Sequence, residues 1–464
     1  MAAGLRADPK RIVHLGLGAF FRAHGLPWIE EAGGWRVTGV SLRSATIRDR
    51  LKPQGWAYHA GERGPDGDIP RRITALDEVL VGPEDMDRIL DAIADPATRI
   101  VTLTVTEKGY CLDPATGRLD TDHPDIVHDL SAALPRSAPG TLLRGLERRR
   151  AAGAGPITVL SCDNLSHNGA VTGAAVRALA EAAGGEMTAW IDGNVSFPSS
   201  MVDRIVPATT DEDIAALAAL GIADAAPVFH EPFRQWAIED DFRAGRPALE
   251  AVGVEMTDDI APFEAMKLRM LNGTHSALAY LGQVLGHRWI SDAAADPDLS
   301  ALIGRLWEQE IIPTLTPPPG TDLFNYAEAL RGRYLNPAIR HGTAQVAMDG
   351  SQKLPQRTLP PLAENVAAGR GHDGMLLVLA AWFRHLSGSG DDGRAQTVSD
   401  PLADRFRKIH ERAASPEAAA ESCLAVREVF DVDLAAAIAP RLVPLYARLV
   451  RDGARQVVRE VNAG

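Results

Sequence analysis

The stretch Arg11-Ile-Val-His-Leu-Gly16-Leu-Gly18-Ala-Phe-Phe-Arg22 decides the fold of this chain. It opens with a short apolar run typical of a buried strand, which leads directly into Gly16 and Gly18. A helix is expected to follow over Ala23–Glu31. A strand that opens onto G-x-G and then a helix begins a dinucleotide-binding fold, because the glycines let the backbone approach a pyrophosphate at the helix N-terminus.

The fingerprint is incomplete, because Phe21 replaces its third glycine, and a glycine-rich turn without a ligand stays open as an alternative. Trp35–Val40 supplies a second strand at the spacing of a βαβ unit. Beyond it, where an acid that binds a ribose is expected, the chain has Ser44-Ala-Thr46. Arg43 and Arg48 could instead meet a 2′-phosphate, so the sequence leaves NAD and NADP both open.

Two further predicted strands carry polar residues just beyond their ends. Ile100–Val105 is followed by Glu107, and Pro156–Ser161 is followed by Asn164. The carboxyl ends of strands line the ligand crevice of an open α/β sheet, so both residues are candidates for the site. The alternative for Asn164 is that it only caps a turn.

A second stretch, Glu264-Ala-Met-Lys-Leu-Arg-Met-Leu-Asn-Gly-Thr-His275, gathers groups that can hold or move a proton. Its pattern predicts one long α-helix over Ala265–Leu285. At about 100° per residue, the four groups that can hold or move a proton fall within an arc of roughly 140°. They are Glu264, Lys267, Asn272 and His275.

Lys267 stands out because the rest of this helix is apolar nearly all round, which indicates burial. Among 48 basic residues only six are lysines, so the surface is served by arginine. Desolvation lowers the pKa of a lysine from about 10.4 toward the range where it accepts a proton at neutral pH. The alternative is that Lys267 extends its ammonium group to solvent.

The chain of 464 residues exceeds a single hydrophobic core. We expect an α/β fold with a Rossmann-type domain over residues 1–255 and a mostly α-helical domain over residues 256–464. The net charge of -13 opposes nucleic acid or an anionic membrane as the main partner. Neither a signal peptide nor a membrane-spanning run is evident, so a cytoplasmic location is expected.

No metal site is expected from the sequence. The three cysteines, Cys111, Cys162 and Cys423, are too widely spaced for a zinc ribbon. His123 and His128 lie close together, but in a polar stretch without obvious further ligands. Another polar segment, Asp349–Arg357, is expected to be a solvated loop, and contact of its Lys353 and Arg357 with substrate or with an ion-pair partner in the other domain stays open.

Six motifs in order resemble the polyol-specific long-chain dehydrogenases, the family of mannitol 2-dehydrogenase that also includes the fructuronate and tagaturonate reductases. The resemblance covers nearly the whole chain. The motifs are Gly16-x-Gly18-x-Phe-x-Arg22, Thr104-x-Thr-Glu107-Lys-Gly-Tyr110, Ser161-Cys-Asp-Asn164-x-x-His-Asn168-Gly, Phe197-Pro-x-x-Met-Val-Asp203-Arg204-Ile, Glu231-Pro-Phe-x-Gln-Trp236 and Lys267-x-x-x-x-Asn272-Gly-x-His275.

The resemblance implies metal-free hydride transfer at a secondary alcohol, with a polyol and its ketose as substrate and product. It implies that Lys267 is the general base and that Asn164 and Asn272 hold the developing oxyanion. The other catalytic residues it implies are His275, which orients the substrate, Asp203, which positions substrate and lysine, and Glu264, which passes the proton to water.

For the cofactor the resemblance implies NAD, held by residues of the first motifs and of the strand ends. They are Gly16, Gly18, Phe20, Arg22, Arg43 and Glu107. Family members commonly carry an acid close after the Leu-Arg at the end of the second strand, where this chain has Ser44-Ala-Thr46, so NADP use is also expected.

Several alternatives can be weighed from residues. None of the six tyrosines has a lysine four positions on, which excludes a short-chain dehydrogenase, and the clustered ligands of a zinc alcohol dehydrogenase are absent. A hexuronate reductase stays open because it shares every motif. A non-catalytic nucleotide sensor would be expected to have lost Lys267, Asn272 or His275, and all three are present. The oligomeric state is open, with a monomer among the options.

Overall fold

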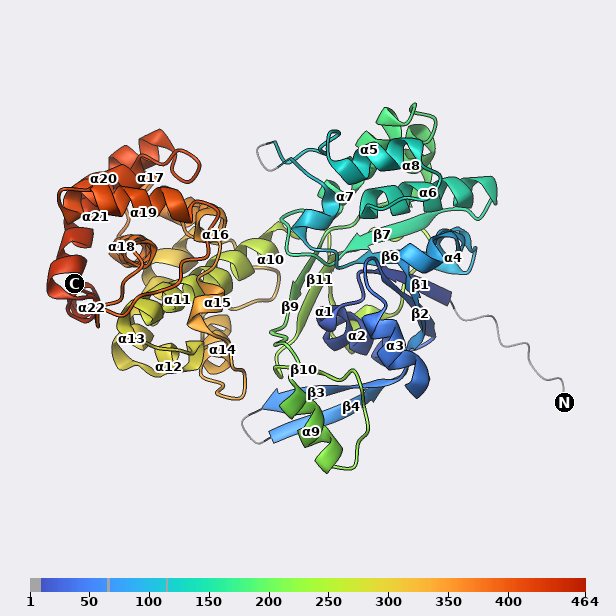
Figure 1. The fold of residues 1–464 in the computed structure, drawn as a ribbon, viewed down its shortest axis with the longest axis horizontal. Helices are drawn as coiled ribbons and strands as arrows, with labels where there is room; N and C mark the ends of the chain where they lie inside the picture. Colours follow the sequence, from blue (N-terminus) through green and yellow to red (C-terminus); the bar gives the residue numbers. More distant parts are fainter. Residues whose placement is uncertain (1–9, 65–66, 114–115) are drawn as a thin grey trace. The chain divides into compact units, whose positions relative to one another are not determined.

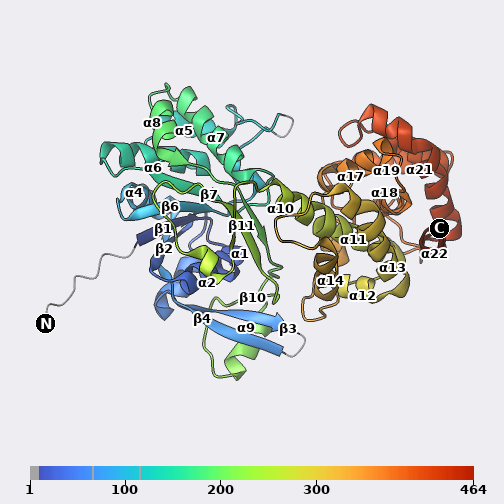
Figure 2. The same cartoon turned by 180° about the vertical axis from the view of Figure 1, so that it is seen from behind.

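The computed structural model describes residues 10–64, 67–113 and 116–464. The chain forms two compact units, of which the first ends at Ala261 and the second begins at Pro262 (Figures 1 and 2). The division into domains at 1–255 and 256–464 stays a prediction.

The first unit is built on a sheet of six strands in the order β5-β2-β1-β6-β7-β8, and every neighbouring pair is parallel. Counted along this sheet, the order is the 3-2-1-4-5-6 of a Rossmann fold. The predicted fold class of this unit is therefore confirmed. The strands are β1 (Lys10–Leu15), β2 (Trp35–Ser41), β5 (Leu76–Val81), β6 (Thr98–Leu103), β7 (Ile157–Ser161) and β8 (Val195–Ser196).

Both faces of this sheet are buried, which explains why its strands are apolar without alternation. Neighbouring residues such as Ile12 and Val13 belong to two separate core clusters. In Figure 1, α4, α6 and α7 lie together beside β6 and β7. The helices of the unit are α1 (Ala19–Ala23), α2 (Gly25–Ala32), α3 (Thr46–Leu51), α4 (Gly82–Ala94), α5 (Pro124–Ser131), α6 (Ala138–Ala151), α7 (Asn168–Ala182), α8 (Thr188–Asn194) and α9 (Asp211–Ala219).

Two small sheets complete the unit, with strand orders β10-β3-β4 and β12-β11-β9. Thr74 and Ala75 lie between β4, which ends at Ile73, and β5, which begins at Leu76. The carboxylate of Glu30 accepts the backbone N–H groups of the intervening Thr74 and Ala75 and ends the ladder there. The strands are β3 (Tyr58–Gly64), β4 (Gly67–Ile73), β9 (Ser200–Asp203), β10 (Val228–His230), β11 (Gln235–Glu239) and β12 (Glu255–Thr257).

The second unit is helical, as predicted, and α18 lies at its centre with twelve buried residues (Figure 1). No helix in the described part of the chain has the length and apolarity needed to cross a membrane. Its α-helices are α10 (Ala261–Met266), α11 (Thr274–Leu285), α12 (Ile290–Ala295), α13 (Pro297–Arg305), α14 (Leu323–Tyr334), α15 (Thr343–Val346), α16 (Gly350–Arg357), α17 (Leu359–Ala367), α18 (Asp373–Leu386), α19 (Ala403–Arg412), α20 (Pro416–Leu424), α21 (Val432–Asp452) and α22 (Ala454–Ala463).

The prediction of a solvated loop over Asp349–Arg357 is wrong, because this segment is helix α16. The polar composition of the segment and Pro355 favoured a loop. Leu354, however, is fully buried and anchors the helix in the core. The helix packs on α17 and on the helical segment that begins at Lys267. Packing therefore outweighs the weak local helix propensity of the segment.

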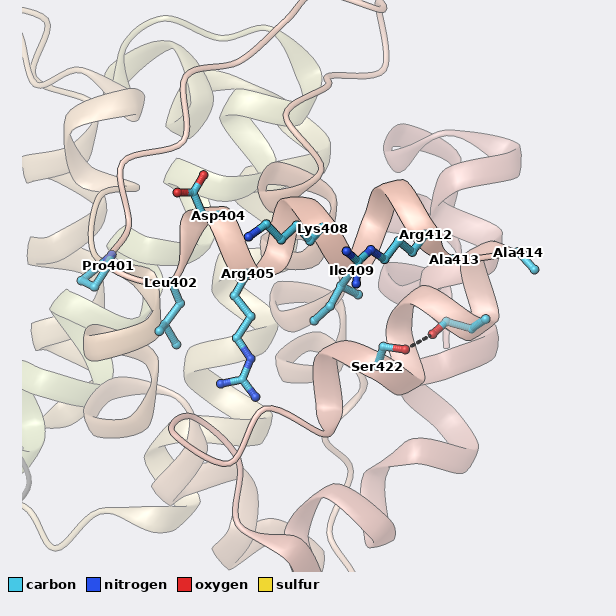
Figure 3. A pocket seen from close by; sticks show the side chains of 11 residues that line it. Pro401, Leu402, Asp404, Arg405, Lys408, Ile409, Arg412, Ala413, Ala414 and Ser422 are labelled. Carbon is cyan, nitrogen blue, oxygen red and sulfur yellow. Dashed lines mark hydrogen bonds between the residues drawn. The ribbon is translucent and has the colours of Figure 1, made fainter.

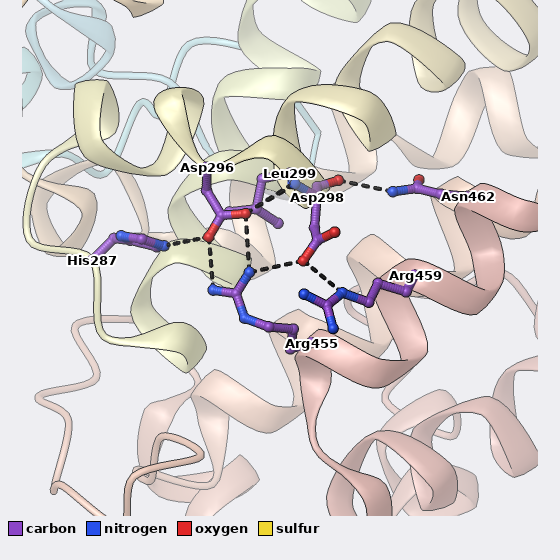
Figure 4. A network of polar contacts seen from close by, with 7 residues as sticks. All are labelled: His287, Asp296, Asp298, Leu299, Arg455, Arg459 and Asn462. Carbon is purple, nitrogen blue, oxygen red and sulfur yellow. Dashed lines mark hydrogen bonds and ion pairs between the residues drawn. The ribbon is translucent and has the colours of Figure 1, made fainter.

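A network of charged side chains ties the start of α13 to the last helix, α22 (Figure 4). The Arg455 guanidinium donates to both carboxylate oxygens of Asp296, at 3.1 and 2.7 Å, and to Asp298 at 2.9 Å. His287 donates a further bond to Asp296. Burial alone would raise the pKa of Asp296, but the bonds from Arg455 and His287 outweigh it and lower the pKa to about 2.

Replacing Arg455 with alanine is expected to lower the free energy of unfolding by about 1–2 kcal/mol at neutral pH, because nearly buried Asp296 loses its main partner while Arg455 is itself partly exposed. The folded-state pKa of Asp296 is depressed, so its contribution is present above about pH 4 and lost as the pH falls toward 2. Urea unfolding across this pH range should show the variant approaching the wild type in acid. Arg459→Ala, which removes a partner of Asp298 alone, should cost less.

Candidate functional site

The turn after β1 is shaped by its first glycine. Gly16 has φ +93°, and a Cβ there would lie 2.2 Å from the carbonyl oxygen of Thr104 on the neighbouring segment. The Thr104 hydroxyl donates to the Gly16 carbonyl, and the Gly18 N–H donates to the same carbonyl at 2.7 Å. A Cβ on Gly18 would meet nothing closer than 3.8 Å. Gly16 is therefore needed by the fold, whereas Gly18 keeps one side of the turn open.

Phe21, which replaces the third glycine, is part of the core. Its ring stacks on that of His14 in β1, with centroids 3.4 Å apart and planes at 4°. On its other side, a Cβ on Gly25 would lie 2.3 Å from this ring. Gly25 therefore leaves room for the Phe21 ring, four residues earlier along the same helical segment. The expected helix over Ala23–Glu31 consequently begins earlier, at Ala19, and is interrupted at His24 between α1 and α2.

Asp163 joins the ends of β6 and β7 at the carboxyl edge of the sheet. Its carboxylate accepts the backbone N–H groups of Val105 and Thr106, at 3.0 and 2.8 Å, and the hydroxyl of Tyr110 at 2.7 Å. These bonds hold Thr106 at φ +66°, a conformation that costs a residue with a β-branched side chain. The clamp fixes the segment that carries Glu107, whose side chain is exposed.

Asn168 fixes the loop that carries Asn164. Its side-chain amide donates to the carbonyls of Asp163 and Ser200, at 2.9 and 2.7 Å, and its oxygen accepts the N–H of Ser200. Ser200 opens β9, and the predicted site residue Asp203 closes that strand, 3% exposed. Asn164 itself is exposed at the sheet edge. The sequence offered no sign of this structural role beyond the place of Asn168 in a motif.

The other predicted cofactor residues are spread over three environments. Arg22 is buried, donates to the Ala226 carbonyl at 2.6 Å and lies over the ring of Tyr58. Phe20 is partly exposed and stacks on His24, with centroids 5.0 Å apart. Arg43 is exposed just past the end of β2. Of the two arginines, Arg43 is the one whose charge is exposed to solvent.

Lys267 begins a π-helical segment, η4 (Lys267–Gly273), between α10 and α11. The expectation of one regular α-helix is therefore wrong across the motif, and so is its projection at a constant angle. Side chains satisfy carbonyls within the segment: the indole N–H of Trp307 donates to the Met270 carbonyl at 3.1 Å, and the Tyr334 hydroxyl donates to the Leu271 carbonyl at 2.7 Å. Such segments occur frequently at functional sites.

The candidate side chains on this segment differ in burial. Glu264, Lys267 and His275 are each 8% exposed, and Asn272 is half-buried. Burial lowers the pKa of His275 well below its usual value, so its imidazole is neutral at pH 7. Its Nε2 has no hydrogen-bond partner among the described residues. A buried polar atom without a partner indicates a place for a ligand or a water.

The surroundings of His275 within the second unit are cationic. Besides burial, the interactions that lower its pKa are with the neighbouring His341 ring and with the positive charges of Arg357, Arg333 and Lys353. Arg357 also donates to the hydroxyl of Ser276 at 3.2 Å, one residue along α11. Lys353 and Arg357 belong to α16. This segment, which was expected to be a loop, is therefore a helix that brings two of these charges to the site.

His341 is a member of this cluster that sequence reasoning missed. Its ring lies 4.9 Å from that of His275, nearly perpendicular to it at 74°. Its Nδ1 is buried and has no hydrogen-bond partner in the described part of the chain. Burial and the charge of Lys353 lower the pKa of His341. Because it lies far from the motif in sequence, in an irregular segment before α15, no spacing signal could have found it.

A groove on the second unit lies apart from these residues (Figure 3). It is formed by α19 and the start of α20, and Arg405, Lys408 and Arg412 line it together with apolar side chains. Arg405 is paired with Glu428. None of the predicted site residues lines this groove, so it is a separate surface feature of α19 and α20.

Comparison with known proteins accounts for nearly the whole chain. Residues 10–251 match the mannitol dehydrogenase Rossmann domain, and residues 259–445 match the mannitol dehydrogenase C-terminal domain. D-mannonate oxidoreductase of Escherichia coli is 42% identical over 461 residues, which cover 97% of this chain and 95% of that protein. Mannitol 2-dehydrogenase of Cereibacter sphaeroides is 39% identical over 467 residues, covering 97% and 96%.

The solved structures include a close match. The ternary complex of Pseudomonas fluorescens mannitol 2-dehydrogenase with NAD and D-mannitol aligns with a TM-score of 0.85 and 37% identity, covering 98% of this chain and 94% of that one. The family models and the relatives agree with the sheet order and the helical second unit. This chain belongs to the mannitol dehydrogenase family of oxidoreductases.

Proposed function

We propose that the protein catalyses NAD-dependent hydride transfer at a secondary alcohol of an open-chain sugar derivative, with Lys267 as the general base. The observation that carries this proposal is the nearly buried Lys267 at the start of a π-helical segment that also bears Asn272 and leads to His275. A lysine placed in this way is expected to accept a proton, whereas a carboxylate of ordinary pKa, about 4, is a weaker base.

Each remaining polar residue has a role in moving or holding charge. As hydride leaves the carbinol carbon, the hydroxyl proton passes to Lys267, and Glu264 carries it on toward water. Asn164 and Asn272 donate hydrogen bonds to the oxygen on which charge develops. Neutral His275 can donate or accept one bond from a substrate hydroxyl, which suits an orienting role.

The residues of the first unit suit a dinucleotide. The turn that follows β1 lies at the switch point between β1 and β6, and Gly18 keeps one side of it open. In the proposed reaction NAD supplies the hydride acceptor. Gly16 and Gly18 would border its pyrophosphate, and Arg43 and Glu107, exposed at the strand ends, would contact the rest of the cofactor.

NAD is expected to be the better cofactor, with measurable use of NADP. A carboxylate after β2 would repel a 2′-phosphate, and Thr46 cannot do so. Arg48 adds little positive charge, because it is paired with Asp49 and Glu84, which leaves Arg43. Thr46→Asp should lower kcat/KM for NADP about tenfold or more, a change of about 1.4 kcal/mol, and spare the NAD reaction. Thr46→Asn is the uncharged control. A wild-type protein that shows no activity with NADP would refute the proposed NADP use.

Chelators are expected to leave turnover unchanged, because two asparagine amides take the role that a Lewis acid plays in zinc enzymes. The protein is dialysed against EDTA and assayed directly at a temperature well below its unfolding transition. Activity that is lost and then restored by zinc would contradict the proposed chemistry.

The substrate could be a neutral polyol or a sugar that carries a carboxylate, and the positive charge around His275 favours the carboxylate. A polyol and its ketose are neutral, whereas a hexuronate or aldonate carries a carboxylate that lysine and arginine side chains recognise. Lys353, Arg357 and Arg333 all act on His275. The relative named D-mannonate oxidoreductase acts, by its name, on such an acid. We therefore propose a carboxylated sugar as the preferred substrate. Assay of hexitols, pentitols and ketouronates with both cofactors tests this directly.

A further inference from the structure

A second group of chemically reactive side chains lies in the first unit, just beyond the segment that carries Glu107. Cys111 follows the short 3₁₀ segment Glu107–Tyr110, and His123 and Asp125 lie at the start of α5. Each offers one ligand atom, and the three atoms all lie within 4.8 Å of one another. The sequence separated Cys111 from His123 by a loop, so the grouping is a product of the tertiary structure.

The three ligand types match one metal. A thiolate, an imidazole and a carboxylate are the side chains that bind Zn²⁺, and three protein ligands leave a fourth tetrahedral position for water. Calcium and magnesium prefer oxygen ligands alone. Cys111 is 5% exposed, and His123 and Asp125 are half-buried, so water can reach the open side of the group.

The electrostatic surroundings of the sulfur favour a cation. The carboxylates of Asp125, Asp129 and Asp120 act on the Cys111 thiol, and the guanidinium of Arg43 opposes them. A divalent ion would offset these carboxylates and bind the thiolate, with release of the thiol proton.

Backbone hydrogen bonds through Asp120 hold Cys111 and His123 in place. The N–H of Asp120 donates to the carbonyl of Cys111 at 2.9 Å, and the N–H of His123 donates to the carbonyl of Asp120 at 3.2 Å. Cys111 also has φ +53°, a conformation that its backbone bonds maintain. Little chain ordering is left for metal binding to produce, which lowers its entropic cost.

Metal binding would break one existing hydrogen bond, which His123 makes at the start of α5. His123 Nδ1 accepts the N–H of Asp125 at 3.2 Å as the N-cap of α5. Metal binding at Nδ1 replaces this partner, and binding at Nε2 places a proton on Nδ1 and removes the bond as well. A capping bond contributes about 1 kcal/mol, so its loss is a small cost of binding the ion.

We propose that Cys111, His123 and Asp125 form a zinc-binding site, with water as the fourth ligand. The ion would connect the segment after Glu107 to the start of α5, and its effect would be on stability rather than on turnover. The site is independent of the proposed hydride transfer, so either proposal can fail alone.

Zinc titration of the full-length protein, followed by removal of free ion and metal analysis, tests the site. The wild type should retain about one zinc ion per chain and melt at a higher temperature than after EDTA treatment. Cobalt in place of zinc should give a thiolate-to-metal absorption band. Cys111→Ser should abolish that band, and His123→Asn, which preserves an N-cap residue, should lose the ion.

Matched controls separate the site from general effects. Cys423→Ser changes a buried cysteine of the second unit, and Asp122→Asn changes an exposed acid beside the site. Both should retain zinc and the cobalt band. Steady-state activity of every variant reports that it is folded. A wild type that retains no zinc, or a Cys111→Ser variant that retains as much as the wild type, would overturn the proposal.

Discussion

Lys267→Ala is expected to lower turnover by roughly 10²- to 10⁴-fold, the range typical of a lost general base. The affinity for the cofactor should stay close to that of the wild type, because the proposed cofactor residues lie in the other unit. Steady-state rates and cofactor titration measure the two quantities separately. The pH profile adds a further readout, since the ionisation assigned to the base should disappear from the profile of the variant.

Lys408→Ala is the matched control, because it removes an exposed lysine of the same unit that is far from the motif in sequence. Its turnover should equal that of the wild type. Lys267→Arg keeps a positive charge but cannot act as a base near neutral pH, so it should be as impaired as the alanine variant. Near-normal turnover in either Lys267 variant would exclude the role of Lys267 as the base.

The second large effect is expected at Lys353, on the choice of substrate. Lys353→Met retains the length of the side chain and removes its charge. The value of kcat/KM for a ketouronate should fall about 10- to 100-fold, as expected for a lost hydrogen bond to a charged group worth about 1.5–3 kcal/mol. The value for a neutral ketose should change much less, so the ratio of the two reports the substrate carboxylate.

Lys408→Met serves as the control here as well. An equal loss on both substrates would show that Lys353 supports the helix or the chemistry instead of the carboxylate. A wild-type protein that turns over hexitols and rejects every ketouronate would refute the proposal of a carboxylated substrate. The role of Lys267 as the base is tested separately, by the Lys267 variants. Arg357 is less suitable for this experiment, because it donates to the Ser276 hydroxyl and to the carbonyl of the proposed site residue Asn272, whereas Lys353 donates to the Val346 carbonyl at 3.4 Å.

The sequence was most informative where one local pattern has one structural solution. The run from Arg11 to Gly18 predicted a buried strand and a glycine turn, and both are present as β1 and the turn at Gly16. It was less informative about the third position of the fingerprint. There Phe21 replaces glycine, and its ring packs in the core against His14 and Gly25.

The helix of the motif shows the same limit. Its apolar composition correctly indicated burial of Lys267 and His275. The π-helical segment could not be anticipated, because carbonyls within it accept hydrogen bonds from Trp307 and Tyr334, which are remote in sequence. The backbone geometry of the motif is therefore set by partners that no local rule includes.

The sequence by itself determined the Rossmann-type unit, the helical unit and the set of polar residues carried by the motifs, because strand periodicity, glycine turns and helix patterns are local properties. Only the tertiary structure placed His341, Lys353 and Arg357 near His275, and Cys111 near His123. The physical reason is that charge and metal-ligand groupings depend on distances between segments. Those distances are fixed by packing in the core, as at Leu354 of α16, rather than by spacing along the chain.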